Sequence, residues 1–226
     1  MPSPVFLFDI DGTLLQSHGV GRRSVTAALE NVVGASYDFS GLPFSGKTDP
    51  QIFGEVLEGA AEAGLEVGHI GTDAFQAAYV REMETGLPQA TVEDLPGAVD
   101  LVRRMHANGA ALGLLTGNIE PIAYDKIGRI GLGRDVFPFG AFGSDHSHRN
   151  ELPAIGARRA AEHLGRSVEG ADLVIIGDTP RDIECARAFG ATAVAVATGH
   201  YSTADLEDAD VVLDTLEGFD LEAVLA

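Results

Sequence analysis

Two aspartates, Asp9 and Asp11, follow an apolar run near the start of the chain and are separated by a single residue. In extended chain both carboxylates project to the same side, while Ile10 projects to the other. Carboxylates this close repel each other unless a cation or a shared proton compensates. The spacing therefore predicts a cation site or an acid–base pair, with an ordinary strand ending in an Asp-Gly turn as the alternative.

Two later apolar runs also end in residues that could do chemistry. Residues 110–115 lead into Thr116-Gly117-Asn118, and residues 173–176 lead into Gly177-Asp178, with Asp182 four positions further on. If these runs are parallel strands of one sheet, their carboxyl ends lie along the same edge. We therefore expect these polar residues to meet the first aspartate pair at one site.

Strands that alternate with helical segments must position this site. From Pro96 onward, apolar strands and helix patterns alternate, which is typical of a parallel, doubly wound sheet. Residues 17–88 contain no strand pattern and predict a helical insert. Its helices are expected near residues 19–33, 51–57 and 73–85. The fold class is therefore α/β: a Rossmann-like core of residues 1–16 and 89–226 with an α-helical cap of residues 17–88.

The charge of the chain limits its partners. Thirty-four acidic against 15 basic residues give a net charge of −19, which argues against nucleic acid or an anionic membrane surface as a partner. No apolar run approaches the length of a membrane span, and no basic region precedes the first apolar run as in a signal peptide. The single cysteine, Cys185, excludes an internal disulfide. We expect a cytoplasmic protein that is a monomer or a weak homo-oligomer.

The string Asp9-Ile10-Asp11-Gly12-Thr13-Leu14, behind four apolar residues, resembles the first motif of the haloacid-dehalogenase-like hydrolase superfamily. The clusters at Thr116 and Asp178 resemble later motifs of the same superfamily, in the expected chain order. The resemblance covers residues 1–16 and about 89–226, and phosphoglycolate-phosphatase-like members are the nearest group. It implies an enzyme that hydrolyses a small phosphorylated metabolite, a phosphomonoester, with Mg²⁺ and through an aspartyl-phosphate.

The resemblance also implies roles for individual residues. Asp9 would be the nucleophile, since carboxylates do form phospho-enzyme intermediates. Asp11 would be the general acid and base, and it points to phosphoryl transfer because members resembling dehalogenases or phosphonatases lack it. Thr116, with Gly117 and Asn118, would bind phosphate oxygens, although Asn118 also suits a helix N-cap.

A metal site belongs to the same resemblance. Asp178 would bind Mg²⁺ beside the Asp9 carboxylate and the Asp11 backbone carbonyl. Asp182 would bind the metal or orient one of its waters, with a first-turn aspartate favoured by the helix dipole as the alternative. Thr13 is expected among the residues that bind the phosphate.

The superfamily usually has a lysine that screens the nucleophile and the phosphate, and neither Lys47 nor Lys126 lies where it is expected. Arg149 precedes a helix at that place, and its permanent charge and planar fork suit a phosphate. We therefore predict that Arg149 takes this catalytic role. Arg158 and Arg159, further along the helix, are expected to be solvated.

The insert contains a second lysine of interest, Lys47, in the loop Ser45-Gly46-Lys47-Thr48-Asp49. A lysine there suggests a substrate-facing position, and a surface loop followed by a helix capped at Thr48 or Asp49 is the alternative. His146 and His148 allow a zinc site, but no further Cys or His cluster supports one, so solvated histidines are expected.

Two other functions remain open from the sequence. A phosphomutase of the β-phosphoglucomutase type would use the same residues and differ only in how the cap retains its substrate. A non-catalytic phosphate-binding or regulatory protein would keep the fold, but the intact Asp9/Asp11 pair argues against it.

Overall fold

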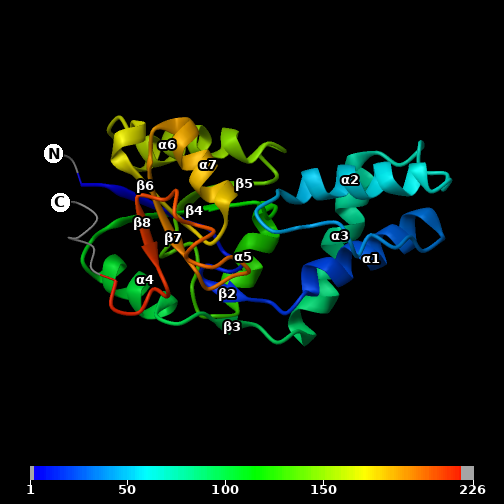
Figure 1. The fold of residues 1–226 in the computed structure, drawn as a ribbon, viewed down its shortest axis with the longest axis horizontal. Coiled ribbons are helices and arrows are strands. Elements are labelled where there is room, and N and C mark those ends of the chain that lie inside the picture. Colours follow the sequence, from blue (N-terminus) through cyan, green and yellow to red (C-terminus); the bar gives the residue numbers. More distant parts are fainter. Residues whose placement is uncertain (1–2, 220–226) are drawn as a thin grey trace.

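A six-stranded parallel sheet forms the centre of the computed structural model, which describes residues 3–219. The strand order is β5-β4-β1-β6-β7-β8, so the chain winds outward from β1 in both directions (Figure 1). The strands are β1 (Val5–Phe8), β4 (Ala111–Thr116), β5 (Phe139–Phe142), β6 (Leu173–Gly177), β7 (Thr192–Val196) and β8 (Val211–Leu213).

Strand β1 is buried on both faces because helices cover both sides of the sheet. Phe6 and Phe8 pack into the apolar cluster of α4 (Ala98–Ala107) and α5 (Glu120–Gly128). Val5 and Leu7 point to the other face, and the helices there are α6 (Leu152–Leu164) and α7 (Pro180–Phe189). This alternation is the period of a strand between two helical layers. The predicted doubly wound α/β fold is confirmed.

The sheet register places the ends of three strands side by side. Phe8 pairs with Leu114 of β4 and with Ile176 of β6, all in parallel register. Asp9 therefore follows β1 between the segments that leave β4 and β6. Three short 3₁₀ helices complete this framework: η1 (Leu87–Gln89), η2 (Arg149–Glu151) and η3 (Gly170–Asp172).

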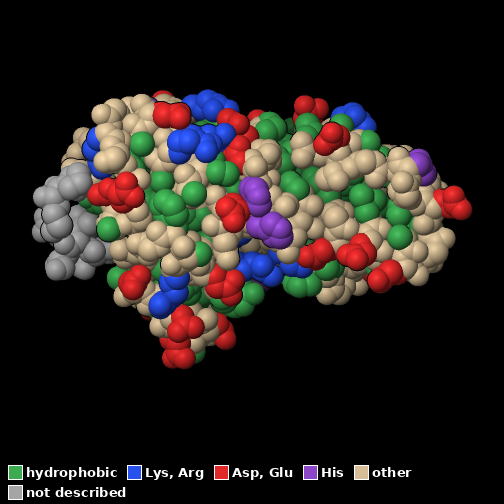
Figure 2. Space-filling model, turned by 90° about the horizontal axis from the view of Figure 1, so that it is seen from above, with side chains coloured by type: hydrophobic (Ala, Val, Ile, Leu, Met, Phe, Trp, Pro, Cys, Tyr) green, Lys and Arg blue, Asp and Glu red, His purple; other side chains and the backbone are tan. Residues whose placement is uncertain are grey.

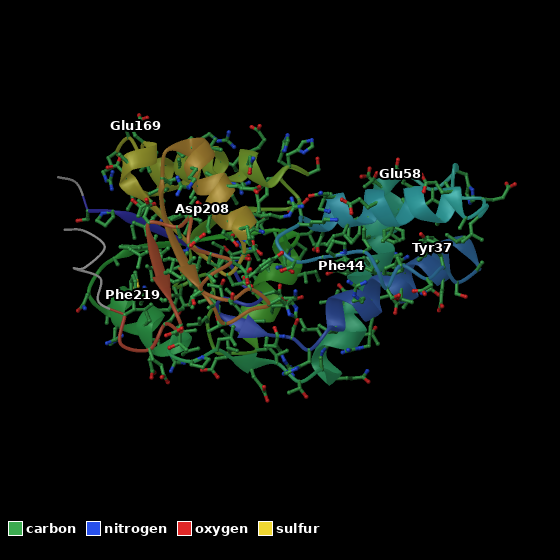
Figure 3. All side chains as sticks on the ribbon, viewed as in Figure 1. Tyr37, Phe44, Glu58, Glu169, Asp208 and Phe219 are labelled. Atoms are coloured by element: carbon green, nitrogen blue, oxygen red, sulfur yellow. The ribbon has the colours of Figure 1, made fainter. Side chains whose placement is uncertain are left out.

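Helices α1 (Val20–Val33), α2 (Asp49–Glu62) and α3 (Thr72–Gly86) pack together beside one end of the sheet (Figure 1). Their predicted positions are confirmed, with α2 longer than expected. They share an apolar cluster of their own, which Ile119 and Ile122 of the sheet-containing part join. Figure 3 shows Tyr37 and Phe44 within this helical part.

A two-stranded antiparallel ribbon lies where the chain enters and leaves the helical part. Strand β2 (Leu15–Gln16) pairs with β3 (Glu93–Asp94), so the two connections are held together. The sequence did not predict this ribbon, because a segment of two residues is too short to show the alternating pattern of a strand. The division of the chain into a core and a cap at residues 17 and 88 stays a prediction.

The surface agrees with the acidic composition. Figure 2 shows Asp and Glu side chains spread over both the sheet-containing part and the helical part of one face. Among the described residues, none of the helices combines the length and the apolarity that crossing a bilayer requires.

Candidate active site

A cavity of about 500 Å³ opens where the carboxyl ends of β1, β4 and β6 face the helical part. The predicted site residues that line it are Asp9, Asp11, Lys47, Thr116, Gly117, Asn118, Arg149 and Asp178. Thr13 and Asp182 are buried beside them but do not line the cavity. The expected convergence of the strand ends is therefore found in the structure.

Asp9 is held rigidly at the end of β1. Its backbone N–H donates to the carbonyl oxygen of Ile176 at 2.9 Å, and its side chain is only 5% exposed. Arg149 Nη2 lies 3.2 Å from Asp9 Oδ2. Burial raises the pKa of Asp9 to about 6, and the opposing effect of Arg149 is offset in part by the nearby Asp182 carboxylate.

Three buried carboxylates lie close together at the cavity. One oxygen from each of Asp9, Asp178 and Asp182 lies within 4.8 Å of the others. Burial, with Asp182 and Asp9 close by, raises the pKa of Asp178 well above its usual range. Such a group of hard oxygen donors suits a divalent cation, whose charge would offset the repulsion.

The chain leaves room for Asp178 by placing glycines beside it. A Cβ atom on Gly12 would lie 2.3 Å from Asp178 Oδ2, and one on Gly199 would lie 1.8 Å from the same oxygen. Gly12 also has a φ of 85°, a conformation that other residues rarely adopt. Thr13 Oγ1 donates to Asp178 Oδ1 at 3.3 Å, so this hydroxyl holds the carboxylate, and its contact with phosphate stays a prediction.

Asp182 has partners at both of its oxygens. Its Oδ2 accepts from the Thr179 backbone N–H at 3.1 Å, as part of the capping box of α7, and also from Thr179 Oγ1 at 2.7 Å. Its Oδ1 accepts from Arg149 Nη2. Asp182 thus fixes Arg149 in place, and its direct contact with a metal stays a prediction.

Arg149 joins the acidic cluster to the helical part. It is buried in η2, contacts Asp9 and Asp182, and donates from Nη1 to the carbonyl oxygen of Gly46 at 3.2 Å. Burial would lower the pKa of Arg149, but Asp182 and Asp9 raise it, so the guanidinium stays charged. Its buried Nε has no partner among the described residues. The structure therefore places the positive charge of Arg149 beside Asp9, and its role in place of the missing lysine stays a prediction.

The segment after β4 forms part of the cavity wall, through Thr116, Gly117 and Asn118. Asn118 donates to Thr116 Oγ1 from both its backbone N–H, at 3.3 Å, and its Nδ2, at 2.8 Å. Helix α5 has Ile119 at its N-cap, so Asn118 does not cap it. A Cβ atom on Gly117 would lie 2.0 Å from the carbonyl oxygen of Lys47, so this glycine allows the loop of the helical part to approach.

Lys47 lines the cavity, but its ammonium is paired with Glu55 of α2. Gln51 Nε2 donates to the other Glu55 oxygen at 2.9 Å. Thr48 is the N-cap of α2 and accepts from the Gln51 backbone N–H at 3.3 Å, as the alternative explanation of this loop required. The loop is therefore both a helix start and a wall of the cavity.

Lys126 is a member of the site that was not predicted from the sequence. Lys126 Nζ lies 2.7 Å from Asp11 Oδ2 and 2.7 Å from Asn118 Oδ1. Burial alone would raise the pKa of Asp11, but the Lys126 ammonium and its hydrogen bond lower it. The sequence does contain an indication that Lys126 is buried and paired. It stands between Ala123 and Ile127 on the apolar face of α5, in a chain with only two lysines.

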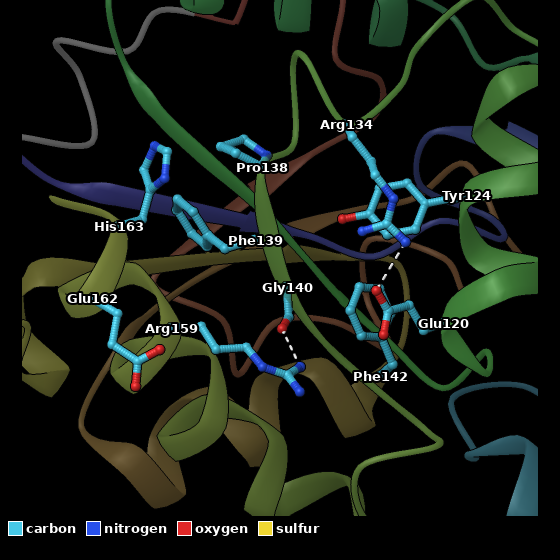
Figure 4. Close-up of a pocket in the computed structure, with 10 residues that line it drawn as sticks. All are labelled: Glu120, Tyr124, Arg134, Pro138, Phe139, Gly140, Phe142, Arg159, Glu162 and His163. Carbon is cyan, nitrogen blue, oxygen red and sulfur yellow. Dashed lines mark hydrogen bonds and ion pairs between the residues drawn. The ribbon is translucent and has the colours of Figure 1, made fainter.

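The remaining candidates lie elsewhere. His148 is exposed and His146 is half-buried, and the one metal-capable cluster found in the described part of the chain does not contain them. Arg159 is half-buried, not solvated as expected, because it forms a two-bond pair with Asp145. It lines a second cavity of about 450 Å³ on the outer side of β5 (Figure 4).

Comparison with known proteins identifies the class of this protein. The family model of the haloacid dehalogenase-like hydrolases matches residues 4–190, and the chain belongs to this family. The predicted superfamily and the prediction of a hydrolytic enzyme are confirmed.

Individual relatives share less than a third of their residues with this chain. The chain is 27% identical to phosphoglycolate phosphatase 1 of Pseudomonas aeruginosa over 86% of its length and 69% of the relative's. It is 28% identical to the phosphoglycolate phosphatase of Chromobacterium violaceum, over 95% and 94% of the two chains. The solved structure of CbbY from Rhodobacter sphaeroides in complex with phosphate matches the fold with a TM-score of 0.80 and 18% identity, covering 99% of this chain and 100% of that one.

Proposed function

We propose that this protein is a Mg²⁺-dependent phosphatase that hydrolyses a small phosphomonoester, phosphoglycolate-like in character, through a phosphoryl group carried on Asp9. The observation that supports it best is the buried Asp9 carboxylate, which lines the cavity, contacts Arg149 and belongs to the acidic cluster. The names of the relatives, phosphoglycolate phosphatases at 27% and 28% identity, support the substrate class.

The metal would be held by the Asp9 and Asp178 carboxylates and the Asp11 backbone carbonyl, with Asp182 in contact or close behind. When bound, Mg²⁺ supplies positive charge to the phosphoryl oxygens and relieves the repulsion among the carboxylates. The oxygen donors and the space that Gly12 and Gly199 leave around Asp178 fit such an ion.

The chemistry of the chain's own residues follows in two steps. An Asp9 oxygen attacks the phosphorus, the bond from phosphorus to the leaving oxygen breaks, and Asp11 donates a proton to that oxygen. Asp11 then takes a proton from a water whose oxygen attacks the phosphorus. The bond to Asp9 breaks, and inorganic phosphate leaves. Arg149 stabilises the negative charge in both steps.

The remaining predicted residues would bind the substrate. The phosphoryl oxygens would accept hydrogen bonds from the segment just before α5, which is Thr116, Gly117 and Asn118. Thr13 would either bind the phosphate as well or hold Asp178 in place through its hydrogen bond. Lys47, from the helical part, would recognise the leaving group.

We propose that residues 17–88 act as a cap over a core of residues 1–16 and 89–226. The separate apolar cluster of α1, α2 and α3 supports this division, as does the β2–β3 ribbon at the junction. A cap that closes would exclude water from the phosphorylated aspartate except for the attacking molecule. We expect the enzyme to work in the cytoplasm on a small phosphorylated metabolite, as a monomer or a weak homo-oligomer, without nucleic acid or membrane partners.

Release of inorganic phosphate from 2-phosphoglycolate, from other small phosphomonoesters and from an aryl phosphate tests the proposal. We expect activity with Mg²⁺, none with excess chelator, and a preference for a small anionic substrate. Activity that persists in chelator would remove the metal from the account. Isomerisation of a sugar phosphate in place of phosphate release would identify a mutase, and binding of phosphate without turnover of any ester would identify a binding protein.

A further inference from the structure

Lys126 is joined to two residues of the proposed active site at once. Its side chain is only 5% exposed, and its Nζ lies 2.7 Å from Asp11 Oδ2 and 2.7 Å from Asn118 Oδ1. Lysine is almost never this deeply buried unless it is paired. Here the pair is formed with the proposed general acid and base, across 115 positions of the chain.

The ammonium fixes the orientation of the neighbouring amide. Lys126 can only donate, so the Asn118 oxygen must face it and the Asn118 nitrogen must face away. That nitrogen then donates to Asp11 Oδ2 at 2.9 Å and to Thr116 Oγ1 at 2.8 Å. Lys126 therefore orients Asp11 directly and, through the amide, orients both Asp11 and Thr116.

The two oxygens of Asp11 are left in different positions. Oδ2 receives hydrogen bonds from Lys126 and from Asn118, while Oδ1 receives one from Ser17 Oγ, at 3.0 Å. The Asp11 side chain is 38% exposed, in contrast to the buried Lys126. Oδ1, with one hydrogen-bond partner against two at Oδ2, is thus the oxygen left freer to exchange a proton with a substrate.

We propose that Lys126 is a positioning residue for Asp11: together with Asn118 it fixes Oδ2, so that Oδ1 is presented for proton transfer. The inference rests on the proposed phosphatase function, because it assigns Asp11 the role of general acid and base. A solely structural Lys126 would stabilise the fold and leave the transition state for proton transfer unchanged.

The leaving group provides the test. Phenolate leaves poorly and needs a proton in the transition state, while 4-nitrophenolate leaves well without one. The value of kcat/KM reports formation of the phosphorylated enzyme from each aryl phosphate. Lys126→Met should lower kcat/KM for phenyl phosphate about tenfold more than for 4-nitrophenyl phosphate, because a misplaced acid costs most where the proton is needed.

A double-mutant cycle shows whether Lys126 acts through Asp11. In an Asp11→Asn background, Lys126→Met should cause no further change in the ratio of the two kcat/KM values, since the group that it positions is already gone. Lys126→Gln, a polar replacement of similar length, should shift the ratio in the same direction as Lys126→Met. It gives the same measurement if the methionine variant does not fold.

Arg159→Met is the matched control. Arg159 is also a cation paired with an aspartate, Asp145, but it lines the second cavity (Figure 4), which shares no lining residue with the cavity of the proposed active site. We expect it to change neither the ratio nor kcat. Equal loss on both substrates in folded Lys126 variants, or a shift that persists without Asp11, would overturn the inference. Absence of Mg²⁺-dependent phosphate release from every phosphomonoester in the wild type would overturn the proposed function instead.

Discussion

Arg149 Nη2 lies 3.2 Å from Asp9 Oδ2, and the same nitrogen is held by Asp182. The pair places a permanent positive charge beside the proposed nucleophile at the point where a phosphoryl group would arrive. An arginine so placed can neutralise charge in the transition state without first having to be oriented. Asp182, which supports the arginine from behind, is itself fixed by the capping box of α7.

Arg149→Ala should therefore lower kcat/KM by about two orders of magnitude or more, and Arg149→Lys should recover part of the loss. Steady-state phosphate release from an aryl phosphate is the measurement. Arg158→Ala, an exposed arginine further along α6, is the control and should stay near the wild-type value. A nearly wild-type Arg149→Ala would show that this arginine is not the catalytic cation.

The helical part should determine which phosphoester is preferred. Lys47→Ala is expected to depress kcat/KM for the preferred anionic substrate about tenfold or more, because a charge-assisted contact to the leaving group is lost. Hydrolysis of an aryl phosphate should change far less, since it offers the lysine no partner. The quantity to compare is the ratio of the two kcat/KM values in wild type and variant.

The Glu55 partner of Lys47 bears on this test. Lys47→Arg keeps the charge and the pairing, so it should keep more of the preference than Lys47→Ala does. If Lys47→Ala leaves the ratio of the two kcat/KM values unchanged, the lysine does not recognise the substrate. Its pairing with Glu55 would then serve only to fix the loop before α2 to that helix.

The acidic cluster should make the protein's stability depend on metal. Because Asp9, Asp178 and Asp182 repel one another, binding of Mg²⁺ to the folded state should raise the melting temperature. Asp178→Asn removes one of the charges, so it should melt higher than the wild type in chelator and respond much less to added Mg²⁺. Thermal melts of both proteins with chelator and with Mg²⁺ measure this. If Mg²⁺ raised the melting temperature of both proteins equally, the ion would bind at a site that does not include Asp178.

Asp49 should give the protein a pH dependence that is separate from catalysis. Burial raises the pKa of Asp49 to about 6, and the effects of Lys126 and of the Ile119 N–H only partly oppose it. Between about pH 4 and pH 6, Asp49 is therefore protonated in the folded state but ionised in the unfolded state. The stability that depends on this proton is full below about pH 4 and is lost as the pH rises past about 6.

Asp49→Asn keeps an oxygen for the Ile119 N–H, which lies 3.0 Å away, and carries no charge. Relative to the wild type, this variant should gain about 2 kcal/mol of stability between pH 4.5 and 7.5, because about 1.5 pH units of that range lie below the folded-state pKa. Urea unfolding at the two pH values, in chelator, is the measurement. A stability difference that does not change with pH would show that Asp49 is ionised in the folded protein throughout.

Most of the site could be predicted because parallel strands end at one edge. Asp9, Thr116 and Asp178 each follow a short apolar run, and the sheet register brings those ends together whatever the length of chain between them. These residues are positioned by backbone topology, which hydrophobic pattern reveals. Arg149 was predicted in another way, because it precedes a helix where the family resemblance leads one to expect a lysine.

Lys126 could not be found in this way. It lies on a helix, and its partner Asp11 is set by how α5 packs on the sheet, not by the end of a strand. The pairing of Lys47 with Glu55 was missed for a related reason: the two residues are eight positions apart, across the start of α2. Side-chain pairing depends on rotamers and on helix packing, which a single sequence does not specify.

The proposed mechanism requires Asp9 to carry the phosphoryl group, and that group can be trapped on the enzyme. The enzyme is mixed with substrate and Mg²⁺, quenched in acid within one turnover, and digested for mass spectrometry. We predict a phosphoryl group on the peptide that contains Asp9 in the wild type and none in Asp9→Asn, which should be folded and inactive. Turnover by Asp9→Asn at the wild-type rate, with no phosphorylated Asp9 peptide from the wild type, would contradict the account.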